Sequence, residues 1–485
     1  MERMSPLDAA FLQAEDEEPS TSMAIASIAV FDGTPPPQDE LLRAFASRLP
    51  LIPRYRQRVA FPHWDLGPPV WVDDPGFDLA FHVRRTAVPA PGDDTDLFRL
   101  MSRVMAQRLD RGRPLWECWV VEGLRDHRWA LISKVHHCMV DGVSGTELYH
   151  LLLSASPDEG LPDEDPPLWQ PNQPPSTLQV TADAAVQLLA SPVRMARLVT
   201  GAVRAPKASV RWALVTARGL VALAGAAVPA HDSTLFGPIG RQRRYDATAV
   251  RLQDVRAICR AHDVTVNDVA LAAATSAFRA LLMARGEACT PNTVRTLVPV
   301  SVRAQGEEGV PENRVSCMLA DLPVQLPDPV ERLQAVHRHL VHLKAVHEAD
   351  AGVAVTDLAA REPFPLVAPV IRAMFRLPQR NIVTVTTNVP GPRTPLYLLG
   401  RRLVRLLPYV PIASRLRFGI AILSYCDEIA FGVTGDYDAA DVELIGREIT
   451  RSVEELLSGL SPDKSRDRRR VHPPADRLQR VAVND

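Results

Sequence analysis

Two adjacent histidines, His136 and His137, are the residues of this sequence whose types and spacing best suit catalysis. They end an apolar run that begins at Trp129, and Asp141 and Gly142 follow after three intervening residues. Successive side chains of a strand point to opposite faces, so one ring can face a substrate while the other packs inward. A neutral imidazole can accept a proton near pH 7, which suits it to general-base chemistry. Asp141 can fix the loop through backbone N–H groups or a buried Arg, and Gly142 allows close approach of a substrate.

The elements around this motif must place it at the end of a strand, where α/β proteins position reactive groups. We expect a strand over residues 129–136, then a loop, then a helix over residues 143–153. The alternative interpretation is a pair of structural histidines, and the position at a strand end favours the functional one. Ser144 is not a serine-hydrolase nucleophile, because Thr146 takes the place of the last glycine in the Gly-x-Ser-x-Gly pattern.

Apolar patterning predicts an α/β protein with helices and strands in both halves of the chain. Ser5 is expected to cap a first helix that has Pro6 at its first position. The further strands expected are residues 23–31, 118–121, 296–302, 381–388 and 418–424, and the further helices are residues 254–260, 267–285 and 440–457.

Composition describes a globular protein and excludes a mostly disordered or fibrous one, since 46% of the 485 residues are hydrophobic and 23% are charged. The formal net charge of -2 gives no sign of a nucleic-acid partner. The six cysteines lack a Cys-x-x-Cys pair, which indicates free thiols in a reducing compartment. Neither a signal peptide nor a window of about 20 apolar residues is visible, so we expect a cytoplasmic protein that does not span a membrane.

Shifts in composition divide the chain into four segments. Residues 1–155 form a first domain, and residues 156–235 form a connector that begins with the Pro-rich, acidic stretch Ser156–Ser176. Residues 236–460 form a second domain, and residues 461–485 form a polar tail that we expect to be disordered.

The connector contains a basic, otherwise apolar segment over residues 181–230. Its arginines recur every seven residues, which places them on nearly one face of a helix: Arg197, Arg204, Arg211 and Arg218. A basic stripe on an apolar helix is typical of a surface that lies on an anionic bilayer. The alternative is a connecting helix packed on its own domains, and Pro192 and Pro206 divide the segment into shorter helices.

Four histidines close together suggest a metal site at first sight: His337, His339, His342 and His347. Their spacing does not match His-x-x-x-His, and no set of carboxylates converges with them, so a solvated helix face is favoured.

The ordered set of motifs resembles a known group of enzymes. The run from His136 to Gly142 has the His-His-x-x-x-Asp-Gly pattern of acyl-CoA-dependent acyltransferases with a chloramphenicol-acetyltransferase-like fold. Further blocks are similar to those of the bacterial wax ester synthase/diacylglycerol acyltransferase family, and they occur in family order: Ser5–Leu12, Leu109–Glu117, Val266–Val269, Pro299–Arg303 and Thr387–Pro392. The segment around Phe236 departs from the pattern, because family members often carry Asn there. The resemblance runs from Ser5 to about Leu457.

This resemblance implies two chloramphenicol-acetyltransferase-like domains, each a mixed sheet flanked by helices, with an active-site tunnel at their interface. It implies an O-acyltransferase that joins the acyl group of an acyl-CoA co-substrate to diacylglycerol or a long-chain fatty alcohol. No cofactor and no metal are expected. Together with the basic segment over residues 181–230, the expected location is cytoplasmic, at the inner face of the membrane or on lipid droplets, with residues 181–230 making the contact.

Within the motif, the resemblance assigns the general base to His137 and an orienting or packing role to His136. Asp141 is interpreted as a structural member that holds the loop, with Arg303 as a candidate partner. Gly142 would leave room for the acyl chain.

Four other residues are candidates for substrate binding. Trp116 could line an acyl channel, although a Trp that enters an apolar strand more often lies in the core. Asn267 and Asp268 stand where a helix starts, so capping is the simpler interpretation. Asn388 and the turn that follows it could supply donors to the oxyanion.

Two alternatives to this function stay open. One is an acyltransferase that takes its acyl group from a carrier protein, as condensation enzymes do. The other is a non-catalytic lipid-binding protein with the same fold. The natural acceptor, the preferred acyl chain length and the oligomeric state do not follow from the sequence.

Overall fold

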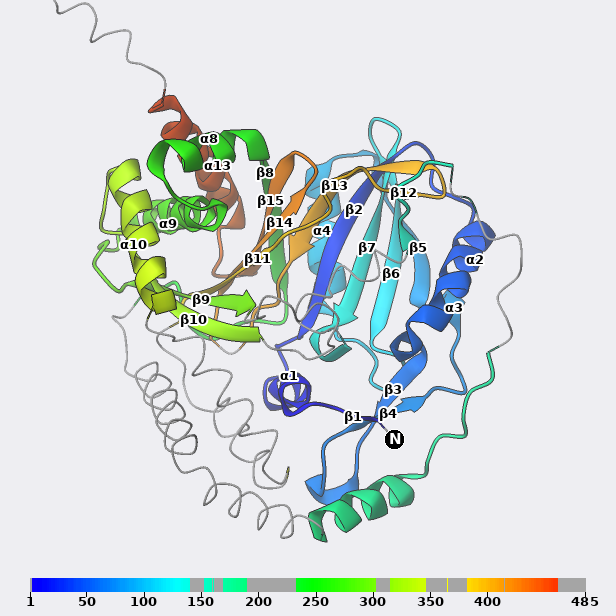
Figure 1. The fold of residues 1–485 in the computed structure, drawn as a ribbon. Helices are drawn as coiled ribbons and strands as arrows, with labels where there is room; N and C mark the ends of the chain where they lie inside the picture. Colours follow the sequence, from blue (N-terminus) through cyan, green and yellow to red (C-terminus); the bar gives the residue numbers. More distant parts are fainter. Residues whose placement is uncertain are drawn as a thin grey trace, which may run out of the picture.

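Two six-stranded sheets lie next to each other in the computed structural model, and a small three-stranded sheet lies below the first (Figure 1). The structure describes residues 2–139, 152–158, 160, 169–189, 233–301, 315–345, 364, 382–413 and 415–460.

The first sheet is mixed, and its strand order is β12-β13-β2-β7-β6-β5. Only the β5–β6 pair is parallel among its neighbouring strands. The strands are β2 (Ala24–Asp32), β5 (Val83–Gly92), β6 (Trp116–Leu124), β7 (Arg128–His136), β12 (Tyr397–Leu398) and β13 (Arg401–Tyr409). The small sheet has the order β1-β4-β3 and consists of β1 (Glu2–Arg3), β3 (Gln57–Ala60) and β4 (Val70–Asp73).

The second sheet is also mixed, with the order β10-β9-β11-β14-β15-β8. Its strand β11 runs parallel to both of its neighbours, and the other pairs are antiparallel. The strands are β8 (Arg243–Arg251), β9 (Val294–Ser301), β10 (Val315–Leu322), β11 (Thr384–Val389), β14 (Phe418–Tyr425) and β15 (Glu428–Asp436).

Helices cover both sheets, and those of the second half gather on one face of its sheet (Figure 1). These are α8 (Leu252–His262), α9 (Val266–Ala284), α10 (Pro329–Ala345) and α13 (Val442–Ser458). The first half has α1 (Pro6–Glu17), α2 (Gln38–Arg48), α3 (Leu79–His82) and α4 (Asp94–Ala106), with the short 3-10 turns η1 (Leu49–Leu51), η2 (Pro53–Arg56), η3 (His63–Asp65) and η4 (His137–Met139).

Strands of the second half of the chain complete the sheet of the first half. Strand β13 pairs with β2 in antiparallel register from Leu403 opposite Phe31 to Tyr409 opposite Ala26. One apolar core therefore contains residues from both halves, in which Tyr245 packs between Phe98 and Tyr409. The division at residues 156–235 and 236–460 did not anticipate this exchange, because a strand pattern does not reveal which sheet the strand joins.

The expected elements agree with the structure to within a few residues, and the prediction of an α/β protein with two mixed, helix-flanked sheets is confirmed. Ser5 caps α1 by accepting a hydrogen bond from the backbone N–H of Asp8 at 3.1 Å. The expected helix over residues 143–153 lies almost wholly outside the described residues, and so does the tail over residues 461–485.

Helix α9 is long and apolar enough to cross a membrane, but 67% of it is buried inside the protein. Its apolar side chains, including Leu271 and Phe278, belong to the core of the second half. Its composition therefore reflects a core helix.

Part of the connector packs against the first half of the chain. Trp169 stacks against the guanidinium of Arg56 at 4.7 Å, and Asn172 donates to the Asp73 carboxylate. A helix over residues 177–189 then lies beside η3, where Thr181 accepts the backbone N–H of His63 (Figure 1). The connector over residues 169–189 is thus attached to the first half, and residues 190–232 lie outside the described structure.

Candidate active site

The two histidines lie where strand β7 ends, and the chain turns between them. His136 is the last residue of β7, and His137 begins η4. The expected difference in their surroundings is present, since His136 is 1% exposed while His137 is half-buried. The cause of this difference is not the expected strand alternation. His137 lies in a 3-10 turn, and the turn re-orients its ring.

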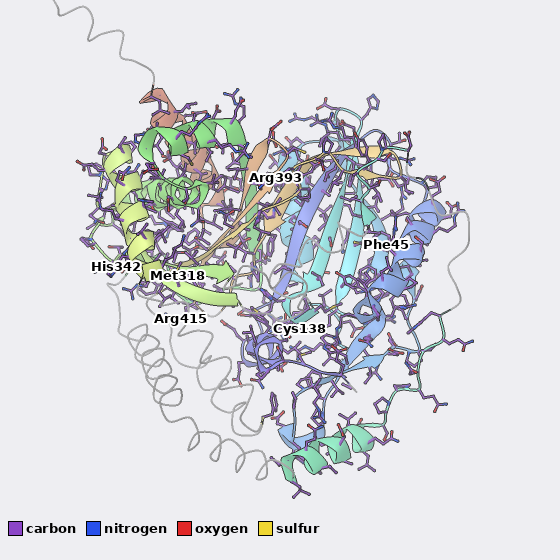
Figure 2. The ribbon with its side chains drawn as sticks, viewed as in Figure 1. Phe45, Cys138, Met318, His342, Arg393 and Arg415 are labelled. Atoms are coloured by element: carbon purple, nitrogen blue, oxygen red, sulfur yellow. The ribbon has the colours of Figure 1, made fainter. Side chains whose placement is uncertain are left out.

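The His136 ring is buried, with a hydrogen bond at Nδ1 and a close polar contact at Nε2. Its Nδ1 accepts the backbone N–H of Cys138 at 3.2 Å. This hydrogen bond places the ring proton on Nε2, which lies 3.3 Å from the Glu15 carboxylate. Cys138 is buried, and Figure 2 shows it beside α1.

Glu15 comes from α1 and is 2% exposed. Its Oε1 accepts the backbone N–H of Met23 at 2.7 Å, and its Oε2 accepts from Arg111 at 3.2 Å. Burial alone would raise the pKa of Glu15, but His136, the Met23 N–H and Arg111 together outweigh it and lower the pKa to about 2. The carboxylate is therefore ionised at neutral pH.

His137 is held by its backbone and by one face of its ring. Its N–H donates to the Met23 carbonyl at 3.0 Å. Phe11, also on α1, stacks against the ring with a centroid distance of 4.0 Å and an interplanar angle of 28°. Burial lowers the pKa of His137 to about 4, so the ring is neutral, and able to accept a proton, at pH 7.

The loop that follows α4 fixes α1 against this strand end. Arg108 donates to the carbonyls of Thr21 and Glu15, and Arg111 donates to the carbonyl of Leu12. The Leu115 carbonyl accepts the N–H of His136 at 2.9 Å. The blocks over residues 5–12, 109–117 and 136–137 thus form one packed unit.

Trp116 lies in the core of the first half, with 1% of its surface exposed. Its Nε1 donates to the Tyr55 carbonyl at 2.8 Å, and its ring stacks on His82 at 4.6 Å. Burial lowers the pKa of His82, which keeps that ring neutral against Trp116. These contacts favour the core interpretation of Trp116.

The structure brings Asn388 and Asn267 together in the second half. The Asn388 side chain, near the end of β11, donates to Asn267 Oδ1 at 3.2 Å in the first turn of α9. Asp268 forms a capping box with Thr265 and accepts from His337 Nδ1 at 2.8 Å. The capping interpretation therefore describes Asp268, whereas Asn267 links a strand end to a helix start.

The histidines of α10 are not all on a solvated face. His337 pairs with Asp268, and His339 Nε2 accepts the N–H of Asp321 at 3.2 Å. His342 is exposed, as Figure 2 shows at the edge of the second half. Among the described residues, no group of three or more His, Cys, Asp or Glu side chains could hold a metal ion.

Three predicted residues lie outside the described structure: Asp141, Gly142 and Arg303. His347 and most of the segment over residues 181–230 lie outside it as well.

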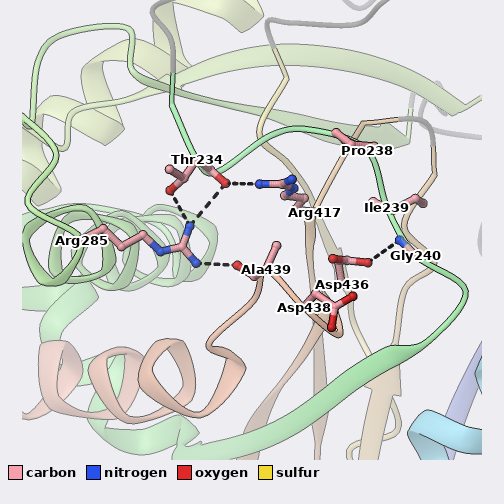
Figure 3. A pocket seen from close by; sticks show the side chains of 9 residues that line it. All are labelled: Thr234, Pro238, Ile239, Gly240, Arg285, Arg417, Asp436, Asp438 and Ala439. Atoms are coloured by element: carbon pink, nitrogen blue, oxygen red, sulfur yellow. Dashed lines mark hydrogen bonds between the residues drawn. The ribbon is translucent and has the colours of Figure 1, made fainter.

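A separate open pocket of about 720 Å³ lies in the second half and does not include the histidines (Figure 3). Arg285 and Arg417 both donate to the Thr234 carbonyl, and Arg285 also donates to the Ala439 carbonyl. On the other side, the Asp436 carboxylate accepts the Gly240 N–H at 2.6 Å. These side chains hold backbone segments together, so the pocket is explained by the fold.

Comparison with known proteins agrees with this arrangement. Residues 4–270 match the wax ester synthase/diacylglycerol acyltransferase catalytic domain, and residues 312–457 match the C-terminal domain of the same family. The chain belongs to this family. The prediction of family membership is confirmed, and so is that of an O-acyltransferase.

The chain is 43% identical to a probable diacylglycerol O-acyltransferase of Mycobacterium tuberculosis, over 94% of this chain and 96% of that protein. The wax ester synthase/diacylglycerol acyltransferase of Marinobacter aquaeolei is 26% identical, with a TM-score of 0.64 over 94% of this chain and 99% of that one. A starter condensation domain of rhizomide synthetase shares the fold, at 15% identity and a TM-score of 0.55 over 94% of each chain.

Sequence reasoning missed two residues of the site, Glu15 and Phe11. Both lie in or just after the block over residues 5–12, which signalled the family but not a contact with the histidines. Their spacing of four residues, which puts them on one face of a helix, was the available signal.

Proposed function

We propose that this protein transfers the acyl group of an acyl-CoA to the hydroxyl of diacylglycerol or a long-chain fatty alcohol, with His137 as general base. The observation that carries the proposal is the position of His137 in the turn after β7, where the Met23 carbonyl holds its backbone and Phe11 stacks on its ring. Burial lowers the pKa of this ring to about 4, so it is neutral at pH 7. The similarity to a probable diacylglycerol O-acyltransferase supports diacylglycerol as an acceptor. No cofactor or metal takes part in this scheme.

One proton moves through His137 in each turnover. The ring takes the proton of the acceptor hydroxyl as its oxygen attacks the thioester carbonyl, forming the new C–O bond. The C–S bond then breaks, the ester leaves, and the CoA thiolate takes the proton back from the imidazolium. No covalent enzyme intermediate is needed, because both substrates can meet at one ring. Asn388 near the end of β11 is a candidate donor to the oxyanion.

A cell-free assay with a long-chain acyl-CoA and each acceptor tests this function. Thin-layer separation distinguishes triacylglycerol from wax ester. We expect His137→Ala to lower kcat by about 10²–10⁴-fold, the usual contribution of a general base. His342→Ala, which alters an exposed histidine of α10, is the matched control and should retain full activity. An active His137→Ala enzyme would rule out this mechanism.

The same assay separates the two alternatives. Transfer from a carrier-bound acyl donor, without transfer from CoA, would indicate the condensation-type donor. Co-purified lipid without turnover on any acceptor would indicate a lipid-binding protein that has kept the fold.

We further propose that the connector brings this protein to an anionic lipid surface, at the inner membrane face or on a lipid droplet. The helix over residues 177–189 exposes Val186 and Leu189, at 65% and 80%, and leads into the arginine-striped segment. In the neighbouring η3 turn, Trp64 is 83% exposed. Exposed apolar side chains beside a basic segment favour a lipid interface.

Sedimentation with anionic liposomes tests the membrane proposal. Replacing Arg197, Arg204, Arg211 and Arg218 with Gln should lower the bound fraction, and 1 M salt should do the same to the unaltered protein. Vesicles of neutral lipid are the control. Unchanged sedimentation of the Gln variant would remove this role from the segment.

A further inference from the structure

We propose that Glu15 is a positioning residue for acyl transfer, and that its Oε1 oxygen fixes the backbone on both sides of His137. This inference rests on the proposed role of His137 as general base. Glu15 itself is separated from the His137 ring by His136 and Met23, so it acts through other residues.

The first connection runs through Met23. Glu15 Oε1 accepts the Met23 N–H at 2.7 Å, and the Met23 carbonyl accepts the His137 N–H at 3.0 Å. The backbone N–H of His137 is thus connected to Glu15 of α1 through the hydrogen bonds of Met23.

The second connection runs through His136. The same oxygen, Glu15 Oε1, lies 3.3 Å from His136 Nε2, and His136 Nδ1 accepts the Cys138 N–H at 3.2 Å. With Nδ1 as acceptor, Nε2 carries the proton that faces the carboxylate. The His136 ring thus lies between Glu15 Oε1 and the peptide that follows His137, in close polar contact with the first and hydrogen-bonded to the second.

Helix α1 adds a third constraint. Phe11 and Glu15 are four residues apart and so lie on one face of the helix. Phe11 stacks on the His137 ring at 4.0 Å. The position of one helix therefore sets both the backbone of His137 and the plane of its ring, while Arg108 and Arg111 hold that helix from outside.

The other carboxylate oxygen serves a different purpose. Oε2 accepts from Arg111, whose second nitrogen also pairs with Asp16 at 2.6 Å. One oxygen of Glu15 thus contacts Met23 and His136, and the other pairs with Arg111. Variants of Glu15 can therefore test whether activity depends on the hydrogen-bond acceptor at Oε1 or on the negative charge of the carboxylate.

Two conservative variants make the distinction. Glu15→Gln keeps an acceptor oxygen at Oε1, although its NH2 group replaces the oxygen that accepts from Arg111, so its kcat should fall less than that of Glu15→Asp. Glu15→Asp keeps the charge but withdraws the oxygen by one methylene, so its kcat should fall by about 100-fold, the typical effect of a misplacement of about 1 Å. KM for acyl-CoA should change less than threefold in both.

Leu333→Ala is the control for stability alone, because Leu333 is a buried apolar residue of α10 in the core of the second half and is not part of α1. It should lower the unfolding midpoint without changing kcat at temperatures where the protein is folded. His137→Ala is assayed in parallel. Suppose that His137→Ala is inactive. The positioning role of Glu15 is then wrong if Glu15→Asp is fully active, or if Glu15→Gln is as slow as Glu15→Asp, and the role of His137 as base is unaffected. If His137→Ala is active, the proposed function itself fails.

Discussion

The two adjacent histidines show how neighbouring residues acquire different chemical properties. His136 is enclosed between Glu15 and the Cys138 N–H, whereas His137 follows the turn and contacts Phe11. Burial of His137 is not compensated by a carboxylate within the described residues, and its pKa is lowered to about 4. His137 is therefore kept in its base form at neutral pH.

This difference predicts the acid limb of the pH profile. His137 must be deprotonated to act as base, so kcat/KM should be constant from pH 8 to about pH 5. It should then fall as the pH drops through the folded pKa of about 4. An inflection near 6.5, the ordinary histidine value, would contradict the burial of this ring.

Folding must be followed in the same experiment. The unfolded chain takes up the His137 proton near its ordinary pKa of 6.5, so this group destabilises the folded state as the pH falls from 6.5 toward 4. The pKa of Glu15 is likewise lowered from its ordinary value of 4.5, and the stabilising contribution of Glu15 is lost as the pH falls from about 4.5 toward 2. Circular dichroism at each pH separates loss of chemistry from loss of fold.

Sequence reasoning at this scale found the histidines but not their partners. The pattern of His136 and His137 is local, so it could be read along the chain. Glu15 and Arg111 lie more than ninety residues away from one another in sequence and meet only when α1 packs below β7. Trp116 shows the converse, because its apolar surroundings in the sequence already favoured the core position that the structure gives it.

Among the elements, helix starts are set by local chemistry. Ser5 caps α1, and Thr265 with Asp268 forms the capping box of α9. Such contacts span only three residues, which is why both helix starts could be predicted from sequence. Asn388 and Asn267 form a contact of another kind, in which the ends of β11 and α9 are joined across 121 positions.

The cap of α9 gives a stability prediction. Thr265→Ala removes the hydroxyl that accepts the Asp268 N–H at 3.2 Å. The expected loss is about 1 kcal/mol, which lowers the unfolding midpoint by roughly 1 °C for a chain of this length. Thr265→Ser keeps the hydroxyl and is the matched control. Equal midpoints for the Ala and Ser variants, measured by thermal denaturation, would show that the cap contributes nothing.

For the whole molecule, the decisive feature is the exchange of β12 and β13 into the sheet of the first half. Tyr245 on β8 donates to the Pro408 carbonyl of β13 at 2.9 Å. A strand of the second sheet is therefore hydrogen-bonded to β13, which lies in the first sheet. The two sheets are consequently joined through a shared core, and not only through the connector.

Gly432 tests this junction. A Cβ atom at this position of β15 would lie 1.8 Å from the Pro408 carbonyl oxygen and 3.0 Å from the Tyr245 hydroxyl. Gly432→Ala must therefore push β13 away or break the Tyr245 hydrogen bond. We expect a loss of about 1–3 kcal/mol in the free energy of unfolding, the usual cost of overpacking.

The matched control is Gly459→Ala, where the nearest atom would be 3.5 Å from the new Cβ and the backbone is helical with φ -64°. Its free energy of unfolding should change by less than about 0.5 kcal/mol. Chemical denaturation of both variants measures the difference. A Gly432→Ala protein as stable as the control would mean that the junction is loosely packed.

The sequence by itself determined what depends on neighbours along the chain: the helix caps, the apolar strands, the histidine motif and, through the order of its blocks, the family. Only the tertiary structure decided which sheet β13 joins, that Glu15 faces His136, and that Phe11 covers His137. The physical reason is range, because hydrogen-bonded caps and side-chain alternation act over a few residues. Strand partners and the burial that shifts a pKa depend on segments that approach one another only in the folded chain.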